Sequence, residues 1–289
     1  MLTPDDSPVK LQPDEFRLLR DLISDYCGLY FEESSLYFLE RRLQNRLARR
    51  GFTSFLDYYY LLLYGPGQDE ELGSVVDVLT TNETYFFREA NQLRTFSEEI
   101  IPEFVMKAQA PRLRIWSAGC STGEEPYTLA MLVLEHPELK DWKVDIFASD
   151  ISQRVLQTAR KGIYTKSSFR SMDPGYRERY FQELDPGRSQ IDDRVKRLVN
   201  FGHLNLLQPE QWTILTFFDI IFCRNVMIYF NAESKKKMVD NFHRKLEKGG
   251  FLLLGHAESL MNISTAFLLR HFRHDMVYQK PLPAPPGRP

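Results

Sequence analysis

The first eighty residues place apolar side chains at helical spacing. Apolar residues recur every three or four positions in successive runs, which glycine or proline residues interrupt. For the second run, Ser34 or Ser35 is a plausible N-cap and Gly51 a plausible stop. The runs cover about residues 12–23, 34–50, 54–64 and 69–79. Since none of them reads as a strand, an all-α N-terminal domain is predicted for residues 1–79.

Beyond about residue 110 the pattern changes to short apolar runs that alternate with helical segments. Runs of strand length cover residues 113–118, 144–149, 218–223 and 251–254. Helical segments follow the first three runs, at residues 126–136, 152–161 and 232–246. Strands that alternate with helices form βαβ units, so this half is predicted to be an α/β domain with a doubly wound parallel sheet.

Two further segments do not follow this alternation. The stretch from about residue 164 to 212 is punctuated by Pro174-Gly175 and Pro186-Gly187, and it is too long for a plain crossover. An inserted subdomain is therefore expected between the second and third strands. The proline-rich residues 281–289 cannot pack much and are expected to form a disordered tail.

Composition narrows the class of protein. The 289 residues carry a formal net charge of −2, which disfavours a protein whose main task is to bind nucleic acid. The three cysteines are too widely spaced for a disulfide framework or a zinc site, so a reducing compartment is expected. The longest apolar stretch, residues 213–223, is too short to span a bilayer, and no signal segment is visible. A cytoplasmic location without membrane insertion follows as the expectation.

The sequence also gives expectations about metal binding and oligomeric state. The six histidines show no H-E-x-x-H pattern, so no metal site is expected. No long exposed heptad indicates a coiled-coil dimer, so we expect a monomer.

The first motif with a chemical interpretation is Ala118-Gly119-Cys120-Ser121-Thr122-Gly123-Glu124-Glu125-Pro126. It lies at the carboxyl end of a predicted strand, where open sheets bind ligands. It is neither a G-x-G-x-x-G loop nor a Walker loop, and its two glutamates would repel phosphates. They suit a cationic or hydroxyl-bearing ligand, and S-adenosylmethionine has an ammonium, a sulfonium and a ribose. The alternative is a glycine turn whose acids are favoured by the helix dipole.

Three more polar segments are candidates for the same crevice. Asp150 ends the second strand, where a carboxylate can accept both ribose hydroxyls, although it could also cap the next helix. Residues 222–230, Phe-Cys-Arg-Asn-Val-Met-Ile-Tyr-Phe, follow the third strand and could face the crevice or form a turn with a core tyrosine. Residues 80–89 join the two halves and could bind across a cleft or serve as a linker with an aromatic anchor.

The last candidate is a basic cluster on the second predicted helix. Residues 41–50 contain no acid, and positions 42, 46, 49 and 50 share one helical face. The cluster consists of Arg41, Arg42, Arg46, Arg49 and Arg50. An acidic partner would explain so many guanidinium groups in one place, and a solvated helix face is the alternative.

Taken together, these segments resemble the chemotaxis receptor methyltransferases of the CheR family. The resemblance rests on Thr-Thr-Asn-x-Thr-x-Phe-Phe-Arg-Glu, Trp-Ser-Ala-x-x-Ser-Thr-Gly-Glu-Glu-Pro-Tyr, Phe-Ala-Ser-Asp-Ile and Phe-Cys-Arg-Asn-Val-Met-Ile-Tyr-Phe, which occur in this order. Each motif is moderately specific, and the four in order are highly specific. The resemblance extends from about residue 12 to residue 280.

The resemblance implies a domain arrangement. A helical domain (1–79) would be followed by a linker (80–90) that contributes to the site. A Rossmann-like S-adenosylmethionine methyltransferase domain (91–280) would carry a small inserted β-subdomain at about residues 164–203.

It also implies site residues and an activity. The enzyme would use S-adenosylmethionine, yield S-adenosylhomocysteine, and form methyl esters on glutamates of chemoreceptor cytoplasmic helices. Arg88 and Tyr229 would lie by the transferred methyl group, and the basic cluster would face the receptor bundle. The implied cofactor contacts are Asn82, Thr84, Arg88, Glu125, Asp150, Asn205, Leu206, Arg224 and Asn225.

Two departures from the family pattern are visible. Ala-Gly-Cys replaces a loop start that is often alanine-rich, which is a mild change. The stretch from Gln182 to Asn200 is short where some members use a longer, glycine-bearing loop to hold a receptor C-terminal peptide. We therefore expect no peptide tether.

Three other functions are weighed against a receptor methyltransferase. A nicotinamide dehydrogenase would use the same fold class, but the G-x-G-x-x-G motif is missing. A non-catalytic binding module that retained the predicted cofactor pocket would not require Arg88 and Tyr229. A nucleic-acid methyltransferase is disfavoured by the near-neutral charge and by the lack of a basic surface interleaved with aromatics.

Overall fold

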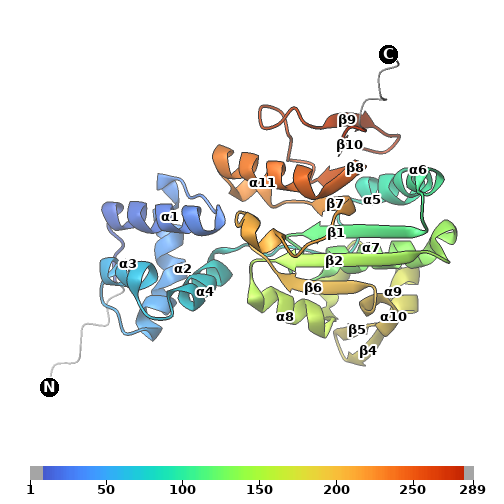
Figure 1. The fold of residues 1–289 in the computed structure, drawn as a ribbon. Helices are drawn as coiled ribbons and strands as arrows, with labels where there is room; N and C mark the ends of the chain where they lie inside the picture. Colours follow the sequence, from blue (N-terminus) through green and yellow to red (C-terminus); the bar gives the residue numbers. More distant parts are fainter. Residues whose placement is uncertain (1–8, 283–289) are drawn as a thin grey trace, which may run out of the picture. The chain divides into compact units, whose positions relative to one another are not determined.

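The computed structural model describes residues 9–282, and the chain divides into two compact units (Figure 1). The first unit contains the residues up to Thr81 together with Tyr229–Asn231. The second contains Asn82–Ile228 and the residues from Ala232 onward. The expected linker is therefore divided after Thr81, and nearly all of it packs with the second unit.

The first unit is helical, and its helices fall where the apolar periodicity places them. They are α1 (Pro13–Cys27), α2 (Leu36–Arg49), α3 (Phe55–Tyr64) and α4 (Gln68–Leu79). The Ser54 hydroxyl caps α3 by accepting from the amides of Leu56 and Asp57. At α2 Ser35 occupies the N-cap position as predicted, but it ends the 3₁₀ turn Glu33–Ser35 and its side chain makes no cap hydrogen bond.

A buried carboxylate lies among the helices of the first unit. Glu71 of α4 is 1% exposed and accepts hydrogen bonds at 3.0 Å from Arg46 Nε, at 2.6 Å from Arg50 Nε and at 2.6 Å from Tyr58 Oη. Burial opposes the ionisation of Glu71, but its hydrogen bonds to Arg46, Tyr58 and Arg50 outweigh that cost and hold its pKa below the ordinary 4.5. Glu71 thereby joins three of the four helices.

A short segment from late in the chain completes the first unit. Leu29 and Phe230 form an isolated antiparallel bridge, and the Tyr30 amide donates to the Tyr229 carbonyl at 2.9 Å. The Asn231 amide group donates to Ser24 Oγ at 3.3 Å. Residues 229–231 are thus fixed to the loop after α1 and to α1 itself.

The second unit is built on a seven-stranded sheet with the order β6-β2-β1-β7-β8-β10-β9. The first five strands are parallel, and β10 runs antiparallel to both of its neighbours. The strands are β1 (Arg112–Ala118), β2 (Lys143–Asp150), β6 (Val199–His203), β7 (Phe218–Cys223), β8 (Leu246–Leu254), β9 (Leu268–His271) and β10 (Met276–Gln279). The predicted α/β class and Rossmann-like sheet are confirmed.

Helices cover both faces of this sheet because successive residues of β1 point to opposite sides. Ile115 belongs to the same buried core cluster as Leu129 of α7 and Phe96, whereas Trp116 meets Trp212 at 4.9 Å and Phe242 of α11 at 5.3 Å between ring centroids. The helices are α5 (Ala90–Thr95), a π-helical turn (Phe96–Ile100), α6 (Ile101–Lys107), α7 (Glu124–Glu135), α8 (Gln153–Lys161) and α11 (Ala232–Lys245).

The insertion holds a small antiparallel sheet of its own, with the order β3-β5-β4. It comprises β3 (Ile163–Thr165), a 3₁₀ turn (Lys166–Phe169), α9 (Pro174–Tyr180), β4 (Phe181–Asp185), β5 (Arg188–Ile191) and α10 (Asp193–Lys196). It ends earlier than expected, since Val199–His203 pairs with β2 in the main sheet. A mixed polar and apolar run of five residues gives no periodic signal, so this strand was not predicted.

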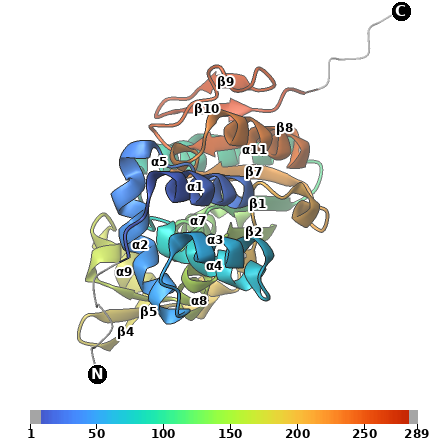
Figure 2. The same ribbon diagram turned by 90° about the vertical axis from the view of Figure 1, so that its left-hand side faces the viewer.

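The far end of the sheet also differs from the prediction. The hairpin of β9 and β10 extends the sheet beyond β8, which Figures 1 and 2 both show. Its strands have four residues each, too few for a pattern to be recognised. The expected disordered tail lies mostly outside the described residues, at positions 283–289. Within residues 9–282, no helix is long and apolar enough to cross a membrane.

Replacing Glu71 by Gln should destabilise the protein by about 3 kcal/mol, because Arg46 would remain partly buried without its counter-charge. Urea unfolding followed by far-UV circular dichroism measures the loss. Since the pKa of Glu71 is lowered on folding, its contribution is present above pH 4.5 and is lost as the pH falls through the lowered value. The difference between wild type and variant should therefore shrink below pH 4.5.

Glu233→Gln is the matched control, because Glu233 pairs with Lys237 on an exposed helix turn. Its effect should stay within about 1 kcal/mol. Equal losses for the two variants would contradict a special role for the buried carboxylate.

Candidate functional site

The loops that follow the parallel strands meet at the carboxyl edge of the main sheet. Because β2, β1, β7 and β8 are neighbours and parallel, the loops after them share that edge. Polar side chains from the start of α7, from the loop after β7 and from the segment that precedes α5 form one hydrogen-bonded group there. Of the residues predicted for cofactor binding, this group includes Glu125, Arg224 and Asn225.

The loop after β1 turns sharply and packs tightly. Gly119 and Gly123 have φ angles of 79° and 94°, and Ser121 also has a positive φ of 49°. A Cβ added to Gly119 would come within 2.4 Å of Val226 Cγ2 in the loop after β7. Glycine is therefore required here for the loops after β1 and β7 to approach each other.

Asp150 connects the loop after β1 with the start of α8. One carboxylate oxygen accepts from the Ser121 amide at 2.8 Å, and the other accepts from the Ser152 amide at 2.9 Å. The cap of α8 is Ser152, whose hydroxyl accepts from the Val155 amide. Asp150 is thus not the N-cap itself, and its 8% exposed side chain lies at the edge where ligands bind.

The Arg224 side chain is the charged centre of the site. The guanidinium group is 3% exposed and pairs with Glu89 at 3.0 Å and with Glu125 at 3.2 Å. It also donates to the Arg88 carbonyl at 2.6 Å. The Ser117 hydroxyl donates to the other oxygen of Glu125 at 2.7 Å. One guanidinium group therefore joins the end of β7, the start of α7 and the segment before α5.

The two carboxylates beside Arg224 differ in their ionisation. Burial raises the pKa of Glu125 above its ordinary value, although the Arg224 charge opposes this. Burial also acts on Glu89, but the charge and hydrogen bonds of Arg224 outweigh it and lower the pKa of that carboxyl. Two carboxylates thus meet one arginine, so the group favours a cationic ligand over an anionic one.

The segment 82–89 is fixed to the second unit by its aromatic residues. Phe86 is fully buried against Phe169, Tyr164 and Phe181, and its amide donates to the Ser168 carbonyl at 2.9 Å. The next residues are strained, since Phe87 and Glu89 both have positive φ angles near 60°. Asn82 and Thr84 are half-buried within the same segment. The expected aromatic anchor is thus present, and the polar contribution of this segment to a binding site stays a prediction.

Arg88 differs from Arg224 in its partners. Its guanidinium donates to the Glu83 carbonyl at 2.8 Å and lies 5.8 Å from the Tyr85 ring centroid. Among residues 9–282 it forms no ion pair with a carboxylate. Its charge is therefore available to a bound group, whereas that of Arg224 is already compensated.

Asn205 and Leu206 follow the unpredicted strand β6. Both are buried, and the Asn205 side-chain oxygen accepts from the Leu207 amide at 3.0 Å, which shapes the turn. The Leu204 amide donates to the Asp150 carbonyl at 3.1 Å. These residues consequently lie at the same edge as Asp150.

The remaining predicted residues belong to the first unit. Tyr229 is 36% exposed, and its carbonyl is held by Tyr30. In the basic cluster, Arg46 and Arg50 bind Glu71, while Arg41, Arg42 and Arg49 are exposed. The cluster is thus divided into two arginines with a structural partner and three that face solvent.

Three carboxylates make contacts that the sequence did not predict. Glu89 ends a motif that was noted, yet its contacts with Arg224 and Asn225 were not foreseen. Glu258 follows β8 and binds the loop after β7; its position after a predicted strand was the available signal. Glu124 was expected to face the ligand, but it is 3% exposed and binds Thr122 and Ser168.

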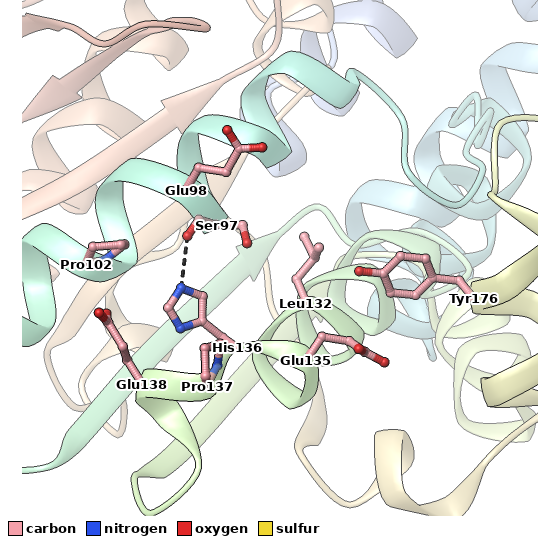
Figure 3. A pocket seen from close by; sticks show the side chains of 9 residues that line it. All are labelled: Ser97, Glu98, Pro102, Leu132, Glu135, His136, Pro137, Glu138 and Tyr176. Carbon is pink, nitrogen blue, oxygen red and sulfur yellow. Dashed lines mark hydrogen bonds between the residues drawn. The ribbon is translucent and has the colours of Figure 1, made fainter.

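A separate pocket of about 460 Å³ lies elsewhere in the second unit (Figure 3). Its lining includes Ser97, Tyr176 and His136, and His136 Nε2 lies 3.0 Å from the Ser97 carbonyl oxygen. His136 directly follows α7, a helix that begins at the carboxyl edge of the sheet and runs away from it. The pocket is thus at the opposite end of α7 from Glu125 and is not the site described above.

Comparison with known proteins agrees with this geometry. Residues 14–80 match the family model described as "CheR methyltransferase, all-alpha domain", and residues 82–275 match "CheR methyltransferase, SAM binding domain". The chain is 38% identical over 269 residues to "Chemotaxis protein methyltransferase 2" of Vibrio cholerae serotype O1, covering 92% of this chain and 93% of that protein.

Other relatives have similar coverage. The "Chemotaxis protein methyltransferase" of Borreliella burgdorferi is 35% identical over 257 residues, which is 87% of this chain and 90% of that protein. "Chemotaxis protein methyltransferase 1" of Pseudomonas aeruginosa is 34% identical over 270 residues, 92% and 97% of the two chains. The resemblance drawn from the four motifs is confirmed. The chain belongs to the CheR methyltransferase family and is an enzyme that uses S-adenosylmethionine.

Proposed function

We propose that this enzyme forms methyl esters on glutamate side chains of the cytoplasmic helices of chemotaxis receptors, with S-adenosylmethionine as the methyl donor. The observation that carries the proposal is the pair of carboxylates, Glu89 and Glu125, that meets Arg224 at the carboxyl edge of the sheet, the edge at which Asp150 ends β2. Its excess negative charge suits a cationic donor. The names of the relatives, which cover almost the whole chain, support a chemotaxis substrate.

The side chains present fit S-adenosylmethionine. Glu125 and Asp150 offer carboxylates to an ammonium group and to ribose hydroxyls, respectively. Ser121 Oγ is buried and has no hydrogen-bond partner among the described residues, so a polar ligand group would satisfy it. The glycines of the loop after β1 let a ligand approach the backbone. We propose Asn82, Thr84, Asn205, Leu206 and Asn225 as further contacts.

Two arginines have different tasks in this proposal. Arg224 uses its guanidinium to hold Glu125 and Glu89, so it positions the acids and its contact with the donor is secondary. Arg88, which has no carboxylate partner of its own, orients the substrate carboxylate beside the donor. Tyr229 is the second residue proposed near the transferred methyl group, and its role stays a prediction.

When bound, S-adenosylmethionine supplies a methyl group on a positively charged sulfur, which a carboxylate oxygen can accept directly. A glutamate has an ordinary pKa of about 4.3, so it is already ionised at neutral pH and needs no general base. The task of the protein is to orient the carboxylate and exclude water from it. A tight ion pair would weaken the nucleophile, so Arg88 should fix its geometry without fully neutralising it.

The exposed arginines of α2 form the surface proposed for receptor binding. Arg41, Arg42 and Arg49 have no carboxylate partner among the described residues and are exposed to solvent. Receptor helices that carry glutamates would be attracted to this positive face. Arg46 and Arg50 take a smaller part, because Glu71 already compensates their charge.

The proposed activity is tested by transfer of a labelled methyl group to a purified receptor cytoplasmic fragment, with a base-labile product as the signature of an ester. Arg88→Ala should lower turnover by about a hundredfold, since the nucleophile loses its orientation. Arg170→Ala is the matched control, because Arg170 lies 3.8 Å from the same Tyr85 ring and pairs with Glu83. Unchanged turnover in Arg88→Ala would remove Arg88 from the catalytic residues, and no labelled ester with wild type would refute the activity.

Binding of S-adenosylhomocysteine should weaken as the pH is lowered below neutrality. Burial raises the pKa of Glu125, so this carboxyl takes up its proton at a higher pH than an ordinary glutamate and then loses its attraction for the ligand ammonium. Calorimetric titrations across this range measure the effect. Glu125→Gln should bind about tenfold more weakly at pH 7 and show a flatter profile. Equal pH dependence in both proteins would show that another group is responsible.

Charge reversal on α2 should separate receptor binding from donor binding. Arg42→Glu combined with Arg49→Glu should raise the KM for the receptor fragment by about tenfold at low salt, with less effect at high salt. Affinity for S-adenosylhomocysteine should be unaffected. Lys140→Glu combined with Lys143→Glu changes the net charge equally at exposed positions of the second unit and should leave the KM unaltered. Similar effects of both pairs would mean that only net charge matters.

A further inference from the structure

Glu258 accepts four backbone hydrogen bonds, three from the loop after β7 and one from the turn after β8. One carboxylate oxygen accepts from the amides of Asn225 at 2.8 Å and Gly255 at 2.7 Å. The other accepts from the amides of Val226 at 2.9 Å and Met227 at 2.6 Å. All four donors are main-chain groups, so the carboxylate fixes the path of the backbone and not merely a side chain.

The geometry of this loop is that of an anion site occupied by the chain's own carboxylate. Asn225 has a φ of 60°, and the left-handed residue turns three consecutive amides toward the same point. A Cβ added to Gly255 would come within 2.9 Å of both the Asn225 nitrogen and Glu258 Oε2. The turn after β8 and the turn after β7 are therefore packed against each other with Glu258 between them.

The loop that Glu258 holds carries the charged centre of the site. Arg224 directly precedes the bound amides and pairs with Glu89 and Glu125. The Asn225 side chain donates to Glu89 at 3.3 Å. Arg224 also donates to the Arg88 carbonyl, which links the loop to the residue proposed to orient the substrate. Displacement of this backbone would move each of these groups.

We propose that Glu258 is a positioning residue for methyl transfer: by binding the amides of residues 225–227 it keeps Asn225 left-handed and aims Arg224 at the two carboxylates. The inference rests on the proposed function, because it assigns Glu258 to the same site. Glu258 acts through Arg224 and Asn225, and all four of its observed contacts are with main-chain amides.

A carboxylate is required because the site offers only donors. Glutamine of the same shape has one acceptor oxygen and an amide group that is itself a donor, so two of the four amides would lose their acceptor. The strained φ of Asn225 is maintained only while surrounding bonds over-determine it. Without them the loop should relax, and Arg224 should no longer meet both carboxylates in the same geometry.

The test is Glu258→Gln in the full-length enzyme, with S-adenosylhomocysteine affinity measured by calorimetry and methyl transfer measured on a receptor fragment. We expect the affinity for S-adenosylhomocysteine to fall by about tenfold. We expect kcat at saturating donor to fall by about tenfold to a hundredfold. The KM for the receptor fragment should be unchanged. Glu258→Asp, which keeps both acceptor oxygens, should recover part of the loss.

Glu247→Gln is the matched control, because Glu247 lies on β8 and pairs with Arg114 at 3.0 Å, away from the carboxyl edge. It should leave affinity and kcat as in wild type. If Glu258→Gln does not fold, the same measurements are made on Gly255→Ala. The added Cβ displaces the contact between Glu258 and the Asn225 amide without removing a charge. Wild-type affinity and kcat in whichever variant folds would overturn the inference. Failure of wild type itself to bind or methylate would instead refute the proposed function.

Discussion

The arrangement of the second unit's site depends on how the charge of Arg224 is compensated. Its guanidinium group is 3% exposed, and a charge so far from water is tolerated only when it is paired and hydrogen-bonded. Glu89, Glu125 and the Arg88 carbonyl provide these partners from two different parts of the chain. The segment before α5 is thereby held at the end of β7. Since two carboxylates surround one arginine, the compensation also leaves negative charge for a cationic ligand.

Strained backbone is concentrated at the same edge. Phe87, Glu89, Ser121 and Asn225 all have positive φ angles, and all four lie in the loops that form the site. Carboxylates stabilise two of these conformations directly, since Asp150 binds the Ser121 amide and Glu258 binds the Asn225 amide. Local strain is thus maintained by ion and backbone contacts between loops. A rigid edge of this kind suits an enzyme whose chemistry consists largely of orienting two reactants.

In the first unit, the arginines of α2 fall into two groups. Arg46 and Arg50 compensate the buried Glu71 and join α2 to α4, so they contribute to the stability of the helical domain. Arg41, Arg42 and Arg49 are left for a partner of opposite charge. Spacing along α2 cannot distinguish the two groups, because Arg42, Arg46 and Arg49 all share one face.

The sequence by itself determined the long elements, the α/β class and the order of the motifs, because periodic apolar patterns and strand-end polar residues are local signals. It located Asp150 and Arg224 at the ends of strands, and Glu125 in the motif that follows a strand, for the same reason. Short elements such as β6 and the β9–β10 hairpin have too few residues to carry a pattern, so only pairing in the sheet defined them. The partners of a charge were likewise decided by the tertiary structure. Glu124 and Glu125 are adjacent and chemically identical, yet one is buried against Ser168 and the other meets Arg224, because only folding brings those distant residues to them.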